Sequence, residues 1–368
     1  MKVLILSSNN GGGHNSVAAA LKQEFAGHGD TVDICDCVAF ISGAVSKVMS
    51  FSHIFMYRHF PGLLDDNFTN EKRKNELFGD DRLLRKFIDL GADSLAERIQ
   101  SGNYDTVICV HVFGGMMLRK AVTKYHLNVK TGFVETDYCN APGSVNNNLD
   151  FHFIPHAGLI PELVEYGVPE ENIRVSGIPV KKTILRKFEK RYAKHLLGIP
   201  EDHDHILLMG GSMGAGPIPA MLELMTKELP FVTDISVVCG TNANMKIRLE
   251  EAFGRNPRIH IFGYMPDMFW IYKASDIFVT KPGGICTTEA GVIGLPMVLL
   301  NVVGCCELFN LEYFTQNNAA LAGSNEYELT ACCKELILNK EKLNRMSEQI
   351  QTLVNPQAAA VIRDCFVQ

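Results

Sequence analysis

Two glycine-rich turns, each placed directly after a short apolar run, constrain the fold of this chain most. Gly11-Gly12-Gly13-His14 follows Lys2–Ser7, and Gly210–Gly216 follows His205–Met209 about two hundred residues later. A glycine-rich turn between a strand and a helix lets backbone N–H groups approach an anion closely. The repeat predicts two similar α/β domains, which suits a chain of 368 residues.

Short β-branched runs alternate with amphipathic stretches along both halves, which predicts parallel sheets covered by helices. Helices are expected at Ser16–Ala26 and Arg82–Ser101. Strands are expected in the first half at Lys2–Ser7, Thr31–Cys35, Thr106–Val110, Thr131–Glu135 and Phe151–Ile154. In the second half they are expected at His205–Met209, Ile235–Cys239, Arg258–Phe262, Asp276–Thr280, Met297–Leu300 and Ala319–Ala322.

The domain boundary is predicted near Gly177–Pro200, where Gly177-Ile178-Pro179 leads into the basic, helix-prone stretch Lys181–Lys194. We therefore expect an N-terminal domain over residues 1–180 and a C-terminal domain over 181–355. The segment that joins them is the expected hinge.

Composition bears on partners and location. The formal net charge of −6 argues against nucleic acid as the main partner, because phosphate binding needs a basic surface. The eleven cysteines lack the spacing of a zinc site, and we interpret them as reduced thiols of a cytoplasmic protein. No apolar run is long enough to cross a bilayer, so we expect peripheral contact with the inner face of the cell membrane if a lipid is involved.

The segment Val38–Asn67 is rich in Phe, Met, Ile and Tyr and is interrupted by basic residues. One interpretation is an amphipathic helix pair that packs on the core. The other is an interfacial segment that helps to capture a lipid acceptor.

His14 lies at the end of the first turn, near the start of the following helix. The positive end of the helix dipole disfavours imidazolium, so a neutral ring that accepts a proton from an alcohol is expected. The alternative is a histidine that only caps the helix. The first turn also resembles a dinucleotide fingerprint with Asp36 as the ribose ligand, which leaves a nicotinamide or flavin enzyme as an alternative.

Two motifs of the second half indicate a site for a diphosphate and a ribose. The helix start at Gly211-Ser212 can receive a diphosphate through backbone donors and the serine hydroxyl. After the strand Asp276–Thr280, Gly283-Gly284 allow close ligand approach, and Thr287-Thr288 offer hydroxyl donors. Glu289, expected in the first turn of the next helix, can accept both hydroxyls of a ribose; otherwise it serves only the helix dipole.

In order and spacing, these motifs resemble those of the inverting GT-B glycosyltransferases that make glycolipids. The monogalactosyldiacylglycerol synthases and processive diacylglycerol glucosyltransferases are most similar, and the lipid I N-acetylglucosaminyltransferase is more distant. The resemblance covers nearly the whole chain and includes Thr136-Asp137, Gly177-Ile178-Pro179, Cys239-Gly240-Thr241-Asn242, Phe262-Gly263-Tyr264 and Glu307-x-x-Asn310. It implies two facing Rossmann-like domains with an interdomain cleft, and a C-terminal helix, about 356–368, that packs on the first domain.

The resemblance also implies roles for single residues. His14 would be the catalytic base, and Asp137 would orient the imidazole or act as base itself. The Phe262–Met265 backbone would contact the uracil, Glu289 the ribose, and Glu307 and Asn310 the sugar or the phosphates. The positions expected to contact the UDP-sugar are Gly12, Gly13, Gly211, Ser212, Gly214, Asn242, Phe262, Gly263, Tyr264, Met265, Gly283, Gly284, Thr287, Thr288, Glu289, Cys306, Glu307 and Asn310.

Three departures from the family pattern suggest a divergent branch with an altered donor or acceptor. Gly304-Cys305-Cys306-Glu307 stands where the family commonly has Pro-Gly-Gln-Glu. Cys286 replaces a threonine, and Val110-His111-Val112 replaces Thr-His-Pro.

The implied reaction moves a hexose from UDP-glucose or UDP-galactose to a lipid alcohol, diacylglycerol above all, by a single inverting displacement. No metal or other cofactor is expected, because helix-terminus donors can stabilise the departing diphosphate; Asp202-His203-Asp204 only superficially resembles a metal motif. The alternatives are another lipid or small-molecule acceptor, a UDP-sugar epimerase or hydrolase of the same architecture, and a non-catalytic UDP-sugar sensor.

Overall fold

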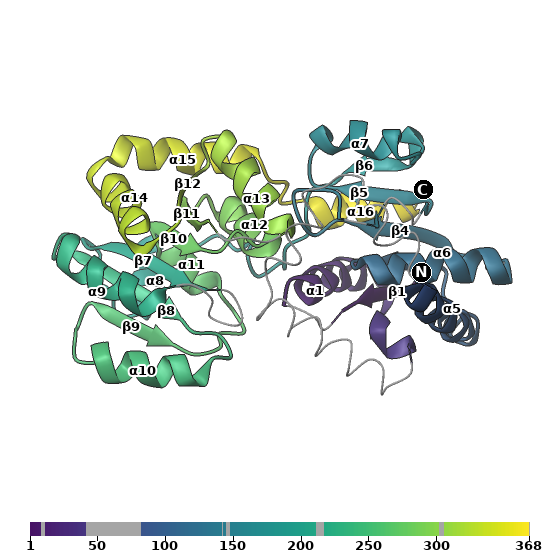
Figure 1. The fold of residues 1–368 in the computed structure, drawn as a ribbon, viewed down its shortest axis with the longest axis horizontal. Helices are drawn as coiled ribbons and strands as arrows, with labels where there is room; N and C mark the ends of the chain where they lie inside the picture. Colours follow the sequence, from purple (N-terminus) through teal and green to yellow (C-terminus); the bar gives the residue numbers. More distant parts are fainter. Residues whose placement is uncertain are drawn as a thin grey trace. The chain divides into compact units, whose positions relative to one another are not determined.

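The computed structural model describes residues 1–8, 12–41, 82–141, 143–144, 148–210, 217–301 and 305–367. The chain divides into two compact units. Unit 1 comprises Met1–Lys182, Val303–Cys306 and the C-terminal segment Asn355–Gln368, and unit 2 comprises Thr183–Val302 and Glu307–Val354. Within the described residues, each unit contains a six-stranded, fully parallel sheet with flanking helices (Figure 1).

The sheet of unit 1 has the order β2-β1-β3-β4-β5-β6. Its neighbours β1 and β3 are followed by connections that lead to opposite ends of the sheet. The strands are β1 Lys2–Ser7, β2 Thr31–Asp36, β3 Thr106–Cys109, β4 Lys130–Val134, β5 Phe151–Ile154 and β6 Ile173–Val175. The helices are α1 Gly12–Gly27, α5 Arg82–Gly102, α6 Val112–Tyr125, α7 Ile160–Glu165 and α16 Ala358–Val367, with short 3₁₀ turns η1 Cys37–Phe40, η3 Ala157–Leu159 and η4 Glu170–Asn172.

The central strands of unit 1 are continuous apolar runs because helices cover both faces of a parallel sheet. Residues Val3–Leu6 of β1 and Val107–Cys109 of β3 have no exposed surface. The alternating pattern of a half-exposed strand is therefore absent from these described strands, and length and β-branching were the signals that located them.

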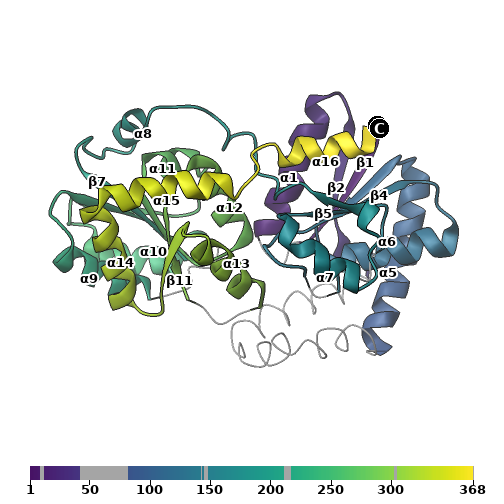
Figure 2. The same cartoon turned by 90° about the horizontal axis from the view of Figure 1, so that it is seen from above.

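The last helix, α16, packs on unit 1 beside α1 and β5 (Figures 1 and 2). Its buried residues Ala358, Ile362 and Phe366 are spaced by four and form one face. The Phe366 ring lies 5.1 Å from that of Phe151 and 5.8 Å from that of Phe153, centroid to centroid. Gly132 of β4 makes room for it, because a Cβ there would lie 2.7 Å from Phe366 Cζ.

Because Phe366 fills this space, Phe366→Ala should destabilise unit 1 by about 3–5 kcal/mol. Chemical denaturation followed by far-UV circular dichroism measures the change in the free energy of unfolding. Phe231→Ala is the matched control, because Phe231 is 75% exposed and its removal should cost less than about 0.5 kcal/mol. Equal losses for the two variants would contradict the packing described here.

The sheet of unit 2 has the order β12-β11-β10-β7-β8-β9. Its neighbours β7 and β10 are followed by connections that lead to opposite ends of the sheet. The strands are β7 Asp204–Met209, β8 Thr233–Val238, β9 Ile259–Phe262, β10 Ile277–Thr280, β11 Met297–Leu300 and β12 Ala320–Gly323. The helices are α8 Lys190–Leu196, α9 Ile218–Glu228, α10 Ala243–Phe253, α11 Phe269–Ala274, α12 Gly284–Ile293, α13 Cys305–Gln316, α14 Glu326–Leu338 and α15 Lys340–Thr352.

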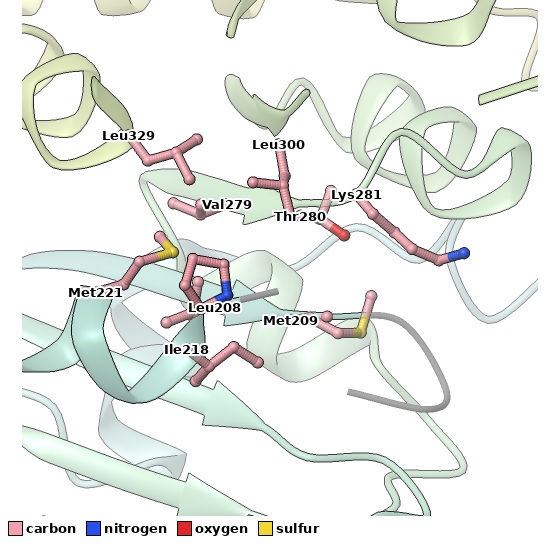
Figure 3. A pocket seen from close by; sticks show the side chains of 11 residues that line it. Leu208, Met209, Ile218, Met221, Val279, Thr280, Lys281, Leu300 and Leu329 are labelled. Atoms are coloured by element: carbon pink, nitrogen blue, oxygen red, sulfur yellow. The ribbon is translucent and has the colours of Figure 1, made fainter. Parts of the chain in front are cut away.

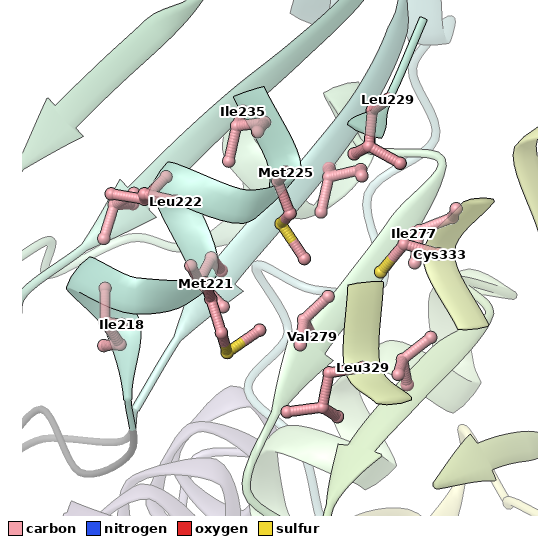
Figure 4. Close-up of a cluster of buried hydrophobic side chains, with 14 of the residues drawn as sticks. Ile218, Met221, Leu222, Met225, Leu229, Ile235, Ile277, Val279, Leu329 and Cys333 are labelled. Carbon is pink, nitrogen blue, oxygen red and sulfur yellow. The ribbon is translucent and has the colours of Figure 1, made fainter. Parts of the chain in front are cut away.

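Helices α9 and α14 cover one face of this sheet (Figure 4). The apolar residues of α9 recur with helical spacing, and Met221 and Met225 point toward the sheet residues Ile277 and Val279 (Figure 4). Leu329 and Cys333 of α14 complete this core cluster. The packing fixes α9 directly after the second glycine-rich turn.

Among the described residues, no helix is both long enough and apolar enough to span a lipid bilayer.

Candidate active site

The candidate site of unit 1 lies at the carboxyl ends of β1 and β3. These strands pair in parallel, with Leu6 opposite Cys109, so the residues that follow them are neighbours. In open α/β sheets, ligands bind outside the carboxyl ends of strands at the point where the strand order reverses. That point in unit 1 is between β1 and β3, where the connections bring His14 and His111.

His14 is the third residue of α1, and its side chain is partly exposed. Its Nδ1 lies 2.7 Å from the carbonyl oxygen of Val110. A carbonyl can only accept, so Nδ1 carries the proton and Nε2 is the unprotonated nitrogen of the neutral ring. The backbone at the end of β3 thus selects the tautomer that a general base needs.

Thr136 joins His14 to Asp137. After β4, the Thr136 hydroxyl lies 3.3 Å from His14 Nδ1 and donates to Asp137 Oδ2 at 3.4 Å. The structure therefore places both predicted catalytic side chains in one hydrogen-bonded chain. In this arrangement Asp137 can stabilise an imidazolium that forms on His14; whether it is itself the base stays a prediction.

His111 is a site neighbour that received no role from the sequence. Its ring meets that of His14 edge-on, with 4.9 Å between the centroids. As the N-cap of α6, its Nδ1 accepts from the Phe113 N–H at 3.3 Å. His111 follows shortly after β3, and β3 is the neighbour of β1 in the sheet. These two facts together would have identified His111 as a neighbour of His14.

The candidate site of unit 2 lies at the corresponding reversal point, where β7 and β10 end side by side. A pocket there is formed by the ends of β7 and β10 and the start of α9 (Figure 3). Leu208, Val279 and Leu329 make its apolar floor, and Lys281 extends away from them (Figure 3). The predicted diphosphate residues Gly211, Ser212 and Gly214 lie outside the described residues.

The start of α12 is held by its own hydroxyls. Thr287 Oγ1 donates to the carbonyls of Gly283 and Gly284 at 2.9 and 3.0 Å, and Thr288 Oγ1 donates to that of Gly284 at 2.6 Å. Both threonines are fully buried. Their hydroxyl hydrogens thus stabilise the turn, and contact with a ligand stays a prediction for Gly283, Gly284, Thr287 and Thr288.

The expectation that Glu289 lies in the first turn of its helix is wrong. Because α12 begins at Gly284, Glu289 is the sixth residue and lies in the second turn. Its side chain is 8% exposed and accepts from the Tyr272 hydroxyl at 3.2 Å. Burial, followed by the Glu289 charge, raises the pKa of Tyr272 well above its ordinary value, so this donor stays protonated.

The second-turn position also weakens the interpretation of Glu289 as a partner of the helix dipole, whose effect is confined to the first turn. An ionised carboxylate can accept several hydrogen bonds, so the contact with Tyr272 does not by itself use all of its acceptor sites. The ribose role remains a prediction.

Glu307 and Asn310 both contact the turn that precedes α12. Glu307, in the first turn of α13, forms an ion pair with Lys281. Asn310 is fully buried, and its amide donates to the Pro282 carbonyl at 2.8 Å. Cys306 lies beside Glu307 and is partly buried. These contacts fix the Lys281–Gly284 turn, while contact with the sugar or phosphates stays a prediction.

Cys286 substitutes a thiol where the family pattern has a hydroxyl. Its Sγ donates to the Gly283 carbonyl at 3.2 Å, which supports the same turn as Thr287. Burial raises the pKa of Cys286 to about 11, so the thiol is neutral near pH 7.

Asn242, predicted to contact the UDP-sugar, and Phe262–Met265, predicted to contact its uracil, follow or end strands at the same edge of the sheet. Asn242 follows β8 and caps α10, accepting from the Met245 N–H at 3.0 Å. Phe262 ends β9, and its carbonyl accepts from the Cys239 N–H at 2.9 Å. Gly263, Tyr264 and Met265 follow, with Tyr264 69% exposed.

In unit 1, the predicted contacts Gly12 and Gly13 are the first two residues of α1, directly before His14.

Two residues of the Asp202-His203-Asp204 motif have partners elsewhere in unit 2. His203 Nδ1 contacts Asp234 Oδ2 at 2.5 Å, and Asp204 pairs with Lys340. Across the part of the chain that the structure describes, no group of three or more His, Cys, Asp or Glu side chains could hold a metal ion.

Known families match both units. Residues 14–180 match the family model of monogalactosyldiacylglycerol (MGDG) synthase, and residues 234–352 match that of the glycosyl transferases group 1. The processive diacylglycerol beta-glucosyltransferase of Bacillus licheniformis is 26% identical over 98% of this chain and 93% of its own length.

Two solved structures show the same architecture. Acinetobacter baumannii MurG has a TM-score of 0.63 at 15% identity, covering 100% of this chain and 99% of its own. The UDP-GlcNAc 2-epimerase from Neisseria meningitidis, bound to UDP-GlcNAc, has a TM-score of 0.66 at 14% identity and covers 100% of both chains. At these identities the two structures establish the GT-B fold alone. The family models, each over one part of the chain, and the full-length relative show that this chain is similar to the monogalactosyldiacylglycerol synthases and processive diacylglycerol glucosyltransferases, with the GT-B fold of the two solved structures.

Proposed function

We propose that this chain transfers a hexose from a UDP-sugar to the hydroxyl of diacylglycerol, with inversion at the anomeric carbon. The observation that carries the proposal is the tautomer of His14. Its Nδ1–H is held by the Val110 carbonyl, so Nε2 can accept a proton at the carboxyl ends of β1 and β3. This site lies in the part of the chain that matches the MGDG synthase model.

In the proposed reaction, the acceptor oxygen attacks the anomeric carbon as His14 Nε2 takes its proton. The bond from the anomeric carbon to the diphosphate oxygen breaks in the same step, and UDP leaves with its electron pair. Asp137, linked through Thr136, offsets the positive charge that forms on the imidazole.

Unit 2 is the proposed donor site, with UDP-glucose or UDP-galactose as donor and no metal or other cofactor. The glycine-rich turn after β7 and the start of α12 supply backbone N–H groups for the diphosphate. Lys281 adds a positive charge beside them, fixed by its ion pair with Glu307. Glu289 binds the ribose, and the backbone of Phe262–Met265 contacts the uracil.

The proposed location is the cytoplasm, with peripheral contact to the inner face of the cell membrane, where the acceptor is reached from the surface. The apolar segment Val38–Asn67, expected to help capture the lipid, lies outside the described residues from position 42 onward.

The proposal is tested by incubating the purified chain with labelled UDP-glucose or UDP-galactose and diacylglycerol in detergent micelles. We expect a labelled glycolipid, with the anomeric configuration opposite to that of the donor in its NMR spectrum. Transfer only to a water-soluble alcohol would replace the lipid acceptor by a small molecule. An altered or hydrolysed UDP-sugar in the absence of any acceptor would favour an epimerase or hydrolase. The only support for that alternative is the similar fold of the UDP-GlcNAc 2-epimerase.

A further inference from the structure

Helix α8 and the residues just before it turn apolar side chains outward. Phe188, Tyr192 and Leu196 are spaced by four residues and are 44%, 48% and 49% exposed. On the opposite face, Ala193 is fully buried and Lys194 is 5% exposed. A surface helix normally buries its apolar face and exposes its lysines, so α8 has the reverse arrangement.

Ion pairs fix this orientation. Lys194 Nζ donates to the His203 carbonyl at 2.5 Å and pairs with Asp276 at 3.2 Å. Lys190 pairs with the other oxygen of the same carboxylate at 2.6 Å. Because Asp276 precedes β10, these contacts attach α8 to the sheet of unit 2. The outward apolar face is therefore built into the fold and does not result from fraying.

Trp270 of α11 joins the exposed side chains into one surface. Its ring lies 4.9 Å from that of Phe188 and 5.8 Å from that of Tyr192, centroid to centroid. Arg186 lies over the same cluster, 5.4 Å from the Trp270 centroid, and pairs with Asp267 at 2.6 Å. Figure 2 shows α8 beside α11. We call Phe188, Tyr192, Leu196 and Trp270 the aromatic patch.

Basic residues outnumber acidic ones in the segment that carries most of the aromatic patch, although the chain as a whole is acidic; several of them also form ion pairs with Asp267, Asp276 and Glu189. Residues 181–196 contain one acidic residue, Glu189, in a chain of net charge −6. Lys187 is exposed, and the side chains of Lys190 and Arg191 are 47% and 70% exposed. The basic residues of this segment that belong to unit 2 are Arg186, Lys187, Lys190, Arg191 and Lys194.

We propose that the aromatic patch docks unit 2 on a membrane surface that contains anionic lipids. Tryptophan and tyrosine favour the boundary between headgroups and acyl chains, where one end of the ring is apolar and the other wet. Exposed lysines and arginines beside them are attracted to anionic headgroups. The choice of a membrane over a protein partner rests in part on the proposed function, because a lipid acceptor must be reached at such a surface.

Trp270 is the only tryptophan of the chain, so its fluorescence reports on the patch alone. The full chain is titrated with vesicles of phosphatidylcholine containing 30–40% phosphatidylglycerol, without UDP-sugar. We expect a blue shift of the emission and quenching by lipids brominated on their acyl chains. Vesicles of phosphatidylcholine alone, or about 0.5 M salt, should weaken binding strongly, because salt screens the attraction between basic residues and headgroups.

Two paired substitutions separate the apolar and the charged contributions. Phe188→Ser with Tyr192→Ser should weaken vesicle binding roughly 10- to 100-fold. Lys187→Glu with Arg191→Glu should weaken it roughly 10-fold or more on anionic vesicles only. Phe231→Ser is the matched control, since Phe231 is 75% exposed and lies under the Arg258 guanidinium, 4.8 Å from its ring centroid. This control should bind like the unmodified chain.

Transfer to a water-soluble, short-chain acceptor separates this proposal from the proposed function. All of these variants should retain that activity. If the unmodified chain shows no transfer to the soluble acceptor, that result counts against the proposed enzyme activity and leaves the docking proposal standing. The docking proposal is overturned if the chain sediments with vesicles while Trp270 emission and bromolipid quenching stay unchanged. It is also overturned if the Trp270 shift occurs without lipid and follows self-association in analytical ultracentrifugation, which would make the patch a protein interface.

Discussion

A His14→Ala variant is expected to lose roughly 10²- to 10⁴-fold in kcat for hexose transfer, with little change in KM for the donor. In the proposed reaction the ring accepts the proton, while donor binding is assigned to unit 2. Initial rates with labelled UDP-sugar and diacylglycerol in micelles measure the effect. Near-normal turnover of His14→Ala would move the role of the base to Asp137.

The side chains around His14 provide graded controls. Thr136→Val removes the hydroxyl that joins His14 and Asp137 but keeps the shape of the side chain, so a loss of about 10-fold in kcat is expected. Thr136→Ser retains the hydroxyl and should restore most of the rate. If Thr136→Val lowers activity as much as His14→Ala, the hydroxyl has a larger role than orientation.

Glu289→Ala is expected to weaken UDP binding roughly 10²-fold or more, because two hydrogen bonds to a charged acceptor are lost from a nearly buried site. Isothermal titration calorimetry with UDP measures the dissociation constant. The same hydrogen bonds can be removed by changing the ligand instead of the protein. A dideoxy analogue of UDP, which lacks the ribose hydroxyls, should bind the unmodified chain much more weakly than UDP does. The Glu289→Ala variant should bind UDP and the analogue equally.

Tyr272→Phe is the matched control for Glu289. It keeps the buried ring and removes the hydroxyl that donates to Glu289 Oε2, so UDP affinity should fall by no more than about 10-fold. Equal UDP affinity of Glu289→Ala and the unmodified chain would show that the carboxylate has only a structural role.

The expected strands are present in both units, because continuous apolar runs between turns leave few other structures for such segments. The structure adds β6, Ile173–Val175, which the sequence analysis omitted. This strand is only three residues long, lies at the edge of the sheet and contains Arg174, so it lacks the length and the apolar pattern that identify a buried strand.

For the functional residues, too, the sequence shows features that depend on local turns but not those that depend on contacts between distant segments. His14 could be identified because a glycine-rich turn fixes its place at a helix start. Glu289 was placed in the wrong turn, since a helix that begins at either Gly283 or Gly284 makes Glu289 its seventh or sixth residue, beyond the first turn. The tautomer of His14 depends on Val110, 96 residues away in the sequence. Such a contact follows from strand order, which periodicity does not reveal.

The docking of α16 on unit 1 has a consequence for how this chain is made. The faces of Gly132, Phe151 and Phe153 that Phe366 covers belong to strands synthesised more than two hundred residues earlier. Until Phe366 has emerged from the ribosome, the side chains of Phe151 and Phe153 lack this packing partner. Every strand of unit 2 has already been translated by then. Unit 1, whose strands are translated before those of unit 2, is therefore the later of the two to be completed, and truncation before residue 358 would leave an apolar surface available to chaperones.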